Sequence, residues 1–297
     1  MKKKKFVQIT ERDIRILKFL WRWKLISESA IAVKFFPDLH PGTAYNRMRE
    51  LQLAGLTEKR ADVKVRHFYW TLTQNGFNTI ADDITGLGER GFASEHIRHD
   101  ALATALHLGD WLVELGNISG IFSEQQLRRV RLEDYPSWVP KSEKHRPDGY
   151  WGFACESGIK PVALEMELTI KSTREYEDIV YFYDSEQRIS RVLWVVSSRG
   201  TAERIKKCFL KVVRKSNGVH SFVLLEHFLE SCWNANIFDG LDIGKTISEF
   251  LESQCKLPIK QAINPPKKFI KNPLLETRRS YIISQTKPNS ELSAKSH

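Results

Sequence analysis

The stretch RPDGYWGFACESGIKPVALEMELTIK, residues 146–171, predicts two adjacent strands. Its second half alternates apolar and polar residues, with Leu164, Met166, Leu168 and Ile170 on one side and Glu165, Glu167, Thr169 and Lys171 on the other. A period of two is typical of a strand that has one face on a core. Upstream, Asp148 opens a short run, 150–153, before a turn around 156–158. If the two runs pair as a hairpin, Asp148 lies near Glu165 and Glu167.

Three carboxylates at one point repel one another, and the usual remedy is a hard divalent cation with oxygen ligands. Asp148, Glu165 and Glu167 are therefore candidate ligands for Mg²⁺ or Mn²⁺. The alternative is that the acidic side of the second strand is a solvated outer face of a sheet, with no ligand.

An aspartate after proline at the start of one strand, followed by acids and a lysine on the next, resembles the core of PD-(D/E)xK nucleases. The resemblance implies that Asp148, Glu165 and Glu167 bind the metal and act in catalysis, and that Lys171 stabilises charge on the scissile phosphate. The chain departs from the family at Glu167, where the usual residue is lysine, so the amine would have to come from Lys171.

The composition is typical of a soluble globular protein of two domains: 297 residues, 41% hydrophobic and 28% charged. No apolar run approaches the length of a membrane span, which predicts a cytoplasmic protein that is not inserted in a membrane. The four cysteines are scattered and suit a reducing compartment. Residues 1–80 carry 16 Lys/Arg against 7 Asp/Glu and residues 256–297 carry 9 against 2, while the centre is net acidic. Basic ends favour contact with a polyanion.

Residues 1–80 predict a winged helix-turn-helix domain that binds DNA. Thr10 and Ser27 precede two helical patterns, Thr43 opens a third, and two extended stretches follow at 57–61 and 66–73. In such a domain the third helix enters the major groove and the wing contacts phosphates. Asn46 and Arg47 are candidate base readers, and the other candidate DNA contacts are Thr43, Arg49, Lys64, Arg66 and His67. A dimerisation or protein-docking module is the alternative.

Residues 92–255 predict a second domain, an α/β fold of the restriction-endonuclease-like, PD-(D/E)xK type. After the hairpin come a helix at 172–188, a strand at 191–197, a helix at 201–213 and a strand at 221–225. The strand at 191–197 is almost continuously apolar, which indicates burial on both faces. The inward residues expected in the two helices are Tyr176, Ile179, Val180 and Tyr183, then Ile205 and Leu210. Prolines, lysines and weak periodicity in 256–297 predict an extended, disordered basic tail.

From Gln8 to about Leu225 the chain is similar to the replication-relaxation family and the related MobC-type relaxases of mobilisable plasmids. The residues that carry the resemblance are TERDIRIL from Thr10, TAYNRMREL from Thr43, His99-Asp100, Pro147-Asp148-Gly149 and Leu164–Glu167. It implies a bacterial, metal-dependent DNA endonuclease that nicks one strand at a transfer origin and initiates conjugative mobilisation. Double-stranded DNA at that origin, other mobilisation proteins and a type IV coupling protein are the implied partners.

Two other interpretations remain open. The chain could be a non-catalytic winged-helix regulator, or an accessory protein of replication or mobilisation, whose second domain serves assembly. Tyrosines near the acidic strand, Tyr176, Tyr181 and Tyr183, could also suggest a covalent link to DNA, although aromatic residues at helical spacing more often pack. Glu124 could be a further acid of the site, or its structural role could be only to pair with an arginine.

Overall fold

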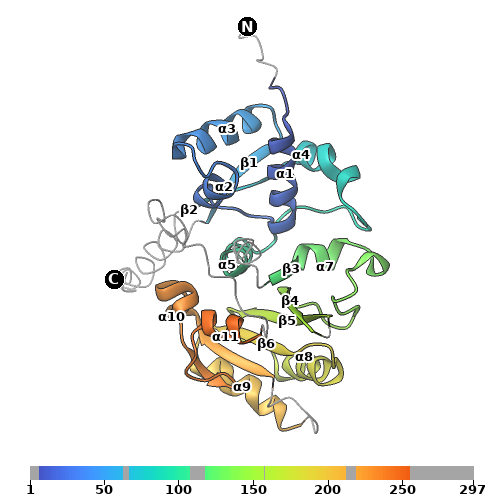
Figure 1. The fold of residues 1–297 in the computed structure, drawn as a ribbon, viewed down its shortest axis with the longest axis vertical. Coiled ribbons are helices and arrows are strands. Elements are labelled where there is room, and N and C mark those ends of the chain that lie inside the picture. Colours follow the sequence, from blue (N-terminus) through green and yellow to red (C-terminus); the bar gives the residue numbers. More distant parts are fainter. Residues whose placement is uncertain (1–6, 63–66, 108–117, 157, 212–218, 255–297) are drawn as a thin grey trace, which may run out of the picture.

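In its described residues the chain consists of helices, a two-stranded sheet and a six-stranded mixed sheet, in two parts that follow one another along the sequence (Figure 1). The structure is a computed structural model that describes residues 7–62, 67–107, 118–156, 158–211 and 219–254. The predicted tail, 256–297, and the predicted DNA contacts Lys64 and Arg66 lie outside these ranges. Within them, no helix is both long and apolar enough to cross a membrane.

The first part, here called the N-terminal module, comprises residues 7–80. Its elements are α1 (Glu11–Trp23), α2 (Glu28–Phe35), α3 (Pro41–Leu53), β1 (Thr57–Asp62), β2 (His67–Leu72) and α4 (Gln74–Ile80). Thr10, Ser27 and Thr73 cap α1, α2 and α4 with their hydroxyl oxygens. The capping box expected between Thr10 and Asp13 is present. Three helices followed by an antiparallel β1–β2 pair are therefore confirmed.

The second part, here called the sheet domain, comprises residues 92–254. Its main elements are α5 (Ile97–His107), β3 (Ile118–Ser123), α7 (Glu124–Arg129), β4 (Gly149–Cys155), β5 (Gly158–Glu167), α8 (Thr173–Ser185), β6 (Arg191–Val196), α9 (Arg199–Phe209), β7 (His220–Leu224), α10 (Leu225–Ser231), β8 (Ile237–Gly240) and α11 (Ile247–Ser253). The strands follow the order β3-β4-β5-β6-β7-β8. The pairs β5–β6 and β6–β7 are parallel, and the others are antiparallel.

Helices cover both faces of this sheet (Figure 1). On one face, Leu164, Met166 and Val195 pack with apolar residues of α5, α10 and α11. On the other face, Trp194 and Val196 pack with residues of α8 and α9. The strand β6 is buried on both faces, as its apolar run predicts.

The hairpin β4–β5 is confirmed, but its second strand is shorter than the alternation predicts. The two strands pair antiparallel, with Gly149 opposite Leu164, and β5 ends at Glu167. The side chain of Ile170, expected on the core face, is 58% exposed. The prediction of a strand as far as Lys171 is wrong because the chain turns away after Glu167 to enter α8 at Thr173.

The helices beyond the hairpin follow the predicted pattern with one exception. All four inward residues expected in α8, among them Tyr176 and Tyr183, are buried, and so is Ile205 in α9. Leu210 is 81% exposed, so its predicted inward position is wrong. The helix α9 ends at Phe209, and the helical period that placed Leu210 inward does not continue past that end.

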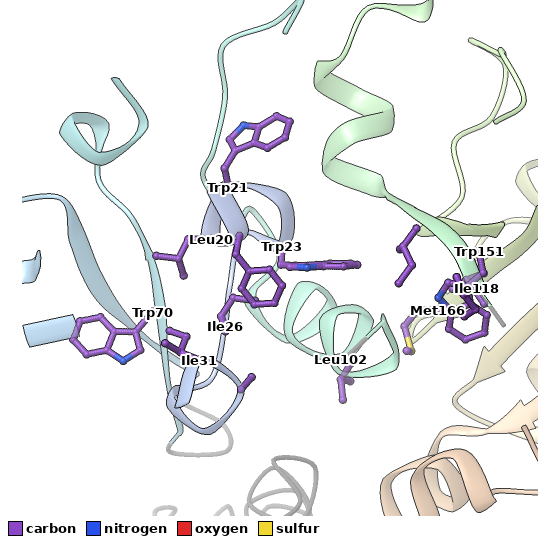
Figure 2. Close-up of a cluster of buried hydrophobic side chains, with 14 of the residues drawn as sticks. Leu20, Trp21, Trp23, Ile26, Ile31, Trp70, Leu102, Ile118, Trp151 and Met166 are labelled. Carbon is purple, nitrogen blue, oxygen red and sulfur yellow. The ribbon is translucent and has the colours of Figure 1, made fainter. Parts of the chain in front are cut away.

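The two parts share one hydrophobic core. Residues of α1 such as Trp23 belong to the same cluster of buried side chains as Leu102 of α5 and Ile118 of β3. Figure 2 shows this cluster running from Trp70 in the N-terminal module, past Trp23, to the side chains at Ile118, Trp151 and Met166. The connection between the parts is also fixed, because the Gly88 amide donates to the Arg129 carbonyl at 2.7 Å.

A buried histidine of β7 makes the free energy of unfolding depend on pH. His220 is 1% exposed, and its Nδ1 accepts a hydrogen bond of 3.0 Å from Trp194 Nε1, so the ring is held neutral. Burial lowers the pKa of His220 to about 3, whereas the unfolded chain has an ordinary histidine pKa near ~6.5. Between these values the unfolded state takes up the extra proton, so this stabilisation is complete above pH ~6.5 and declines as the pH falls, by about 1.4 kcal/mol per pH unit.

The measurement is urea unfolding of the parent and His220→Asn between pH 7 and pH 5. The asparagine retains an acceptor for Trp194 but does not titrate. We expect the free energy of unfolding of the parent to fall more steeply with acid, by about 1.4 kcal/mol per pH unit. Parallel pH profiles for the two proteins would show that His220 takes no part in the acid response.

Candidate functional site

The four residues predicted to form the catalytic site lie at one edge of the sheet. Glu165 and Glu167 are among the last three residues of β5. Asp148 immediately precedes β4, and its amide donates to the Leu164 carbonyl at 3.0 Å. This is the edge where the parallel strands β5 and β6 have their carboxyl ends, the usual position of ligand sites in α/β sheets. Glu165 and Glu167 are only 5% and 2% exposed. The alternative of a solvated outer face is therefore wrong.

Glu165 is held by two donors from the α8 side of the sheet. Its Oε1 lies 2.6 Å from His145 Nε2 and also accepts a hydrogen bond from the Tyr183 hydroxyl. Burial, followed by the charge of Glu165, raises the pKa of Tyr183 well above its ordinary value. A phenol that resists ionisation is a poor nucleophile, which disfavours Tyr183 as a residue that links covalently to DNA.

Glu167 and Lys171 form an ion pair at the end of β5. Burial raises the pKa of Glu167, and the negative charges of Glu165 and Asp148 add to this effect while Lys171 opposes it. Burial acts to lower the pKa of Lys171, but Glu167, Glu165 and Asp148 together raise it. Lys171 therefore lies in the field of all three carboxylates, although β5 does not extend to it.

Asp148 has partners on the α5 side. Its Oδ2 accepts a hydrogen bond of 2.6 Å from the Met166 amide, and its Oδ1 lies 3.3 Å from His99 Nε2. Burial disfavours the charge of Asp148, but His99 and the Met166 amide lower its pKa below the ordinary value. Burial also opposes the charge of His99, yet Asp148 and Asp100 raise the pKa of His99 to about 11. The pair is therefore carboxylate and imidazolium at neutral pH.

A second cluster of charges adjoins Asp148. Lys24, at the end of α1, contacts Asp100 of α5 and Glu124 of α7. Glu124 also pairs with Arg128, at 2.7 Å. Glu124 and Asp148 line the same small cavity, and the pairing of Glu124 with an arginine is the alternative that the sequence left open.

The donor chemistry of the acidic edge suits Mg²⁺ or Mn²⁺, since Asp148, Glu165 and Glu167 offer carboxylate oxygens. Each of these carboxylates is paired with a side chain of the protein, namely His99, His145 with Tyr183, and Lys171. In the part of the chain that the structure describes, no three His, Cys, Asp or Glu side chains form a ready group of metal ligands. A bound ion would therefore have to exchange with these partners.

The predicted DNA contacts lie on the N-terminal module. Thr43, Asn46 and Arg49 are exposed on α3, as a surface that contacts DNA requires. The side chain of Arg47 instead contacts the start of α1, where its Nε donates to Asp13 Oδ1 at 2.8 Å. Its Nη1 lies 2.6 Å from Oε2 of Glu50, on the same helix as Arg47. Reading a base with Arg47 would break these bonds. The backbone of His67 begins β2.

Comparison with known proteins adds no relative. The chain matches no protein-family model, no curated protein and no solved structure. The resemblance to replication-relaxation proteins therefore rests on the residues quoted above.

Two residues of the site carry no signal in the sequence. Lys24 follows the apolar end of a helix, and His145 lies in a charged loop, so neither belongs to a motif. Their partners are distant along the chain: Lys24 and Glu124 are 100 residues apart, and His145 and Glu165 are 20 apart. Only the fold brings them to the acidic edge.

Proposed function

We propose that this chain is a DNA-binding endonuclease of the relaxase type, which nicks one strand at a transfer origin with the help of Mg²⁺ or Mn²⁺. The observation that supports it best is the end of β5, where Glu165 and Glu167 are buried, Lys171 pairs with Glu167, and Asp148 is hydrogen-bonded to the backbone of Leu164 and Met166. A helical module whose third helix presents Thr43, Asn46 and Arg49 would bind the duplex. The basic ends of the chain favour the same polyanionic partner.

The residues have distinct roles in this proposal. Asp148 and Glu165 would hold the ion, which supplies charge neutralisation at the phosphate. Glu167, whose pKa is raised, is suited to take a proton from the attacking water. The water oxygen bonds to phosphorus as the bond to one sugar oxygen breaks, and that oxygen takes a proton from solvent. Lys171 would stabilise the negative charge that develops on the phosphate.

A non-catalytic DNA-binding regulator is the second candidate. It is favoured by the pairing of every acid at the edge with a protein side chain, which satisfies their charges without an ion. In that case the buried pairs would serve the folding of the sheet domain, and the N-terminal module alone would carry the function.

The test is the conversion of supercoiled plasmid to open circles, with the transfer origin of the encoding element in the plasmid. The proposal expects nicking that requires Mg²⁺ or Mn²⁺ and that is lost in Asp148→Asn and in Glu165→Gln. A matched control is Glu143→Gln, which neutralises an exposed acid near Asp148. Gel-shift binding should be the same in all four proteins. Retained binding with no metal-dependent nicking by the parent would reject the endonuclease and favour the regulator.

A further inference from the structure

The end of α1 is fastened to the sheet domain through its backbone. The Ser123 hydroxyl donates to the Arg22 carbonyl at 2.9 Å, and the Thr104 hydroxyl donates to the Trp23 carbonyl at 3.1 Å. The ring of Trp23 lies in the shared core, between α1 and the side chains at Ile118 (Figure 2). The last residues of α1 therefore cannot move independently of β3 and α5.

The backbone at Lys24 is in a conformation that is rare for residues other than glycine. Its φ is 61° and its ψ is −47°, and the Leu25 amide donates across it to the Trp23 carbonyl at 2.6 Å. This is a γ-turn, which stops the helix and redirects the chain within one residue. A rare conformation persists only where the surroundings hold it.

The side chain of Lys24 ends between two acids of the sheet domain. Its Nζ lies 3.1 Å from Asp100 Oδ1 and 2.8 Å from Glu124 Oε2, and the side chain is only 12% exposed. Each of the two acids has a second basic partner. Glu124 pairs with Arg128, and Asp100 pairs with His99. Lys24 is thus the contribution of the N-terminal module to a buried charge cluster.

From Asp100 the contacts continue to the acidic edge. Asp100 Oδ1 lies 3.6 Å from His99 Nδ1, and His99 Nε2 lies 3.3 Å from Asp148 Oδ1. His99 Nε2 is also 3.2 Å from the Met166 carbonyl, and the Met166 amide donates to the other oxygen of Asp148. Because Met166 separates Glu165 from Glu167, His99 orients Asp148 relative to both glutamates.

We propose that Lys24 is a positioning residue of the nicking site: through Asp100 and His99 it fixes Asp148 against β5, so that the seating of the N-terminal module sets the geometry of the acids. This inference rests on the proposed function for its effect on nicking, but its structural consequence at Met166 is independent of catalysis. Lys24 does not touch the substrate in this scheme.

The experiment compares Lys24→Met with Lys18→Met, which removes a lysine of the same helix whose ion pair with Asp83 is exposed. We expect Lys24→Met to slow nicking at saturating DNA by about tenfold to a hundredfold, since small misplacements of catalytic groups have effects of this size. Exchange of the Met166 amide hydrogen should accelerate by about tenfold, because its acceptor Asp148 is no longer held in place. The DNA affinity of Lys24→Met should equal that of the parent. Lys18→Met should match the parent in nicking rate and in exchange at Met166.

Two further variants separate positioning from folding. Lys24→Arg keeps the charge and should restore most of the nicking rate and of the Met166 protection. The double variant Lys24→Met/Asp100→Asn removes both charges of the pair, so it should recover stability toward urea but not the nicking rate. Recovery of the rate in the double variant would show that Lys24 only compensates a buried charge, and would overturn the proposal.

Failure of this inference and failure of the proposed function give different results. If Lys24→Met nicks and exchanges like Lys18→Met, Lys24 is not a positioning residue, while nicking by the parent still supports the endonuclease. If the parent does not nick, the endonuclease is rejected. Exchange at Met166 then still decides whether Lys24 holds Asp148.

Discussion

Lys171→Met is expected to slow nicking by about a hundredfold to a thousandfold, the usual effect of removing one group that stabilises charge in the transition state. Lys171 is the amine that lies in the field of Asp148, Glu165 and Glu167 and has its side chain partly open to solvent. A phosphate at the edge could therefore reach it. The loss should fall on kcat, because the charge that Lys171 stabilises develops only during the reaction.

Lys171→Arg is the variant to compare with Lys171→Met, because it tests whether the positive charge is what matters at this position. It keeps the positive charge and the pairing with Glu167 and should retain a measurable part of the rate, although arginine does not reproduce the geometry of an ammonium group. Single-turnover nicking with the protein in saturating excess over DNA separates the chemical step from binding. A Lys171→Met protein that nicks at the parental rate would remove Lys171 from the site.

Arg47→Met is expected to lower the free energy of unfolding by about 3 kcal/mol, because it leaves a buried carboxylate without its cation. The side chain of Asp13 is 1% exposed, and Arg47 contacts both of its oxygens, at 2.8 and 2.5 Å. Thr10 donates two further hydrogen bonds to Asp13 and retains part of the stabilisation. Urea unfolding at neutral pH measures the difference.

The control is Arg49→Met, which removes an exposed arginine of the same helix and should change stability by less than about 0.5 kcal/mol. The double variant Asp13→Asn/Arg47→Met should recover part of the loss, since no unpaired charge remains. Equal stability of Arg47→Met and the parent would show that Asp13 is solvated in the folded protein. Weaker DNA binding by an Arg47 variant is evidence for base reading only if its fold is intact.

The features that sequence predicted correctly are local. Two runs separated by a short turn gave the β4–β5 hairpin, and Thr10 and Ser27 marked helix starts because capping depends on residues three apart. The same pairing places the backbone of Asp148 beside the end of β5, where its amide donates to the Leu164 carbonyl. The alternation that continued to Lys171 was misleading, because a pattern does not record where a strand stops pairing with its neighbours.

The features that sequence missed depend on contacts between distant segments. Arg47 looked like an exposed base reader because its partner Asp13 lies 34 residues away, on another helix. Lys24 and Asp100 are 76 residues apart. A single sequence records the residue types but not which of them meet, so charges that neutralise one another across the fold look like free surface charges.

The continuity of the apolar cluster from Trp70 to Trp151 bears on how the protein can be dissected. Truncation at the connection near residue 80 would remove the α1 residues that pack with Leu102 and Ile118, and would leave a hydrophobic surface on the remaining fragment. Such a fragment is prone to aggregate, so its inactivity would say nothing about catalysis. The cut would also take away Lys24, and each half is therefore best studied by point substitution within the intact polypeptide.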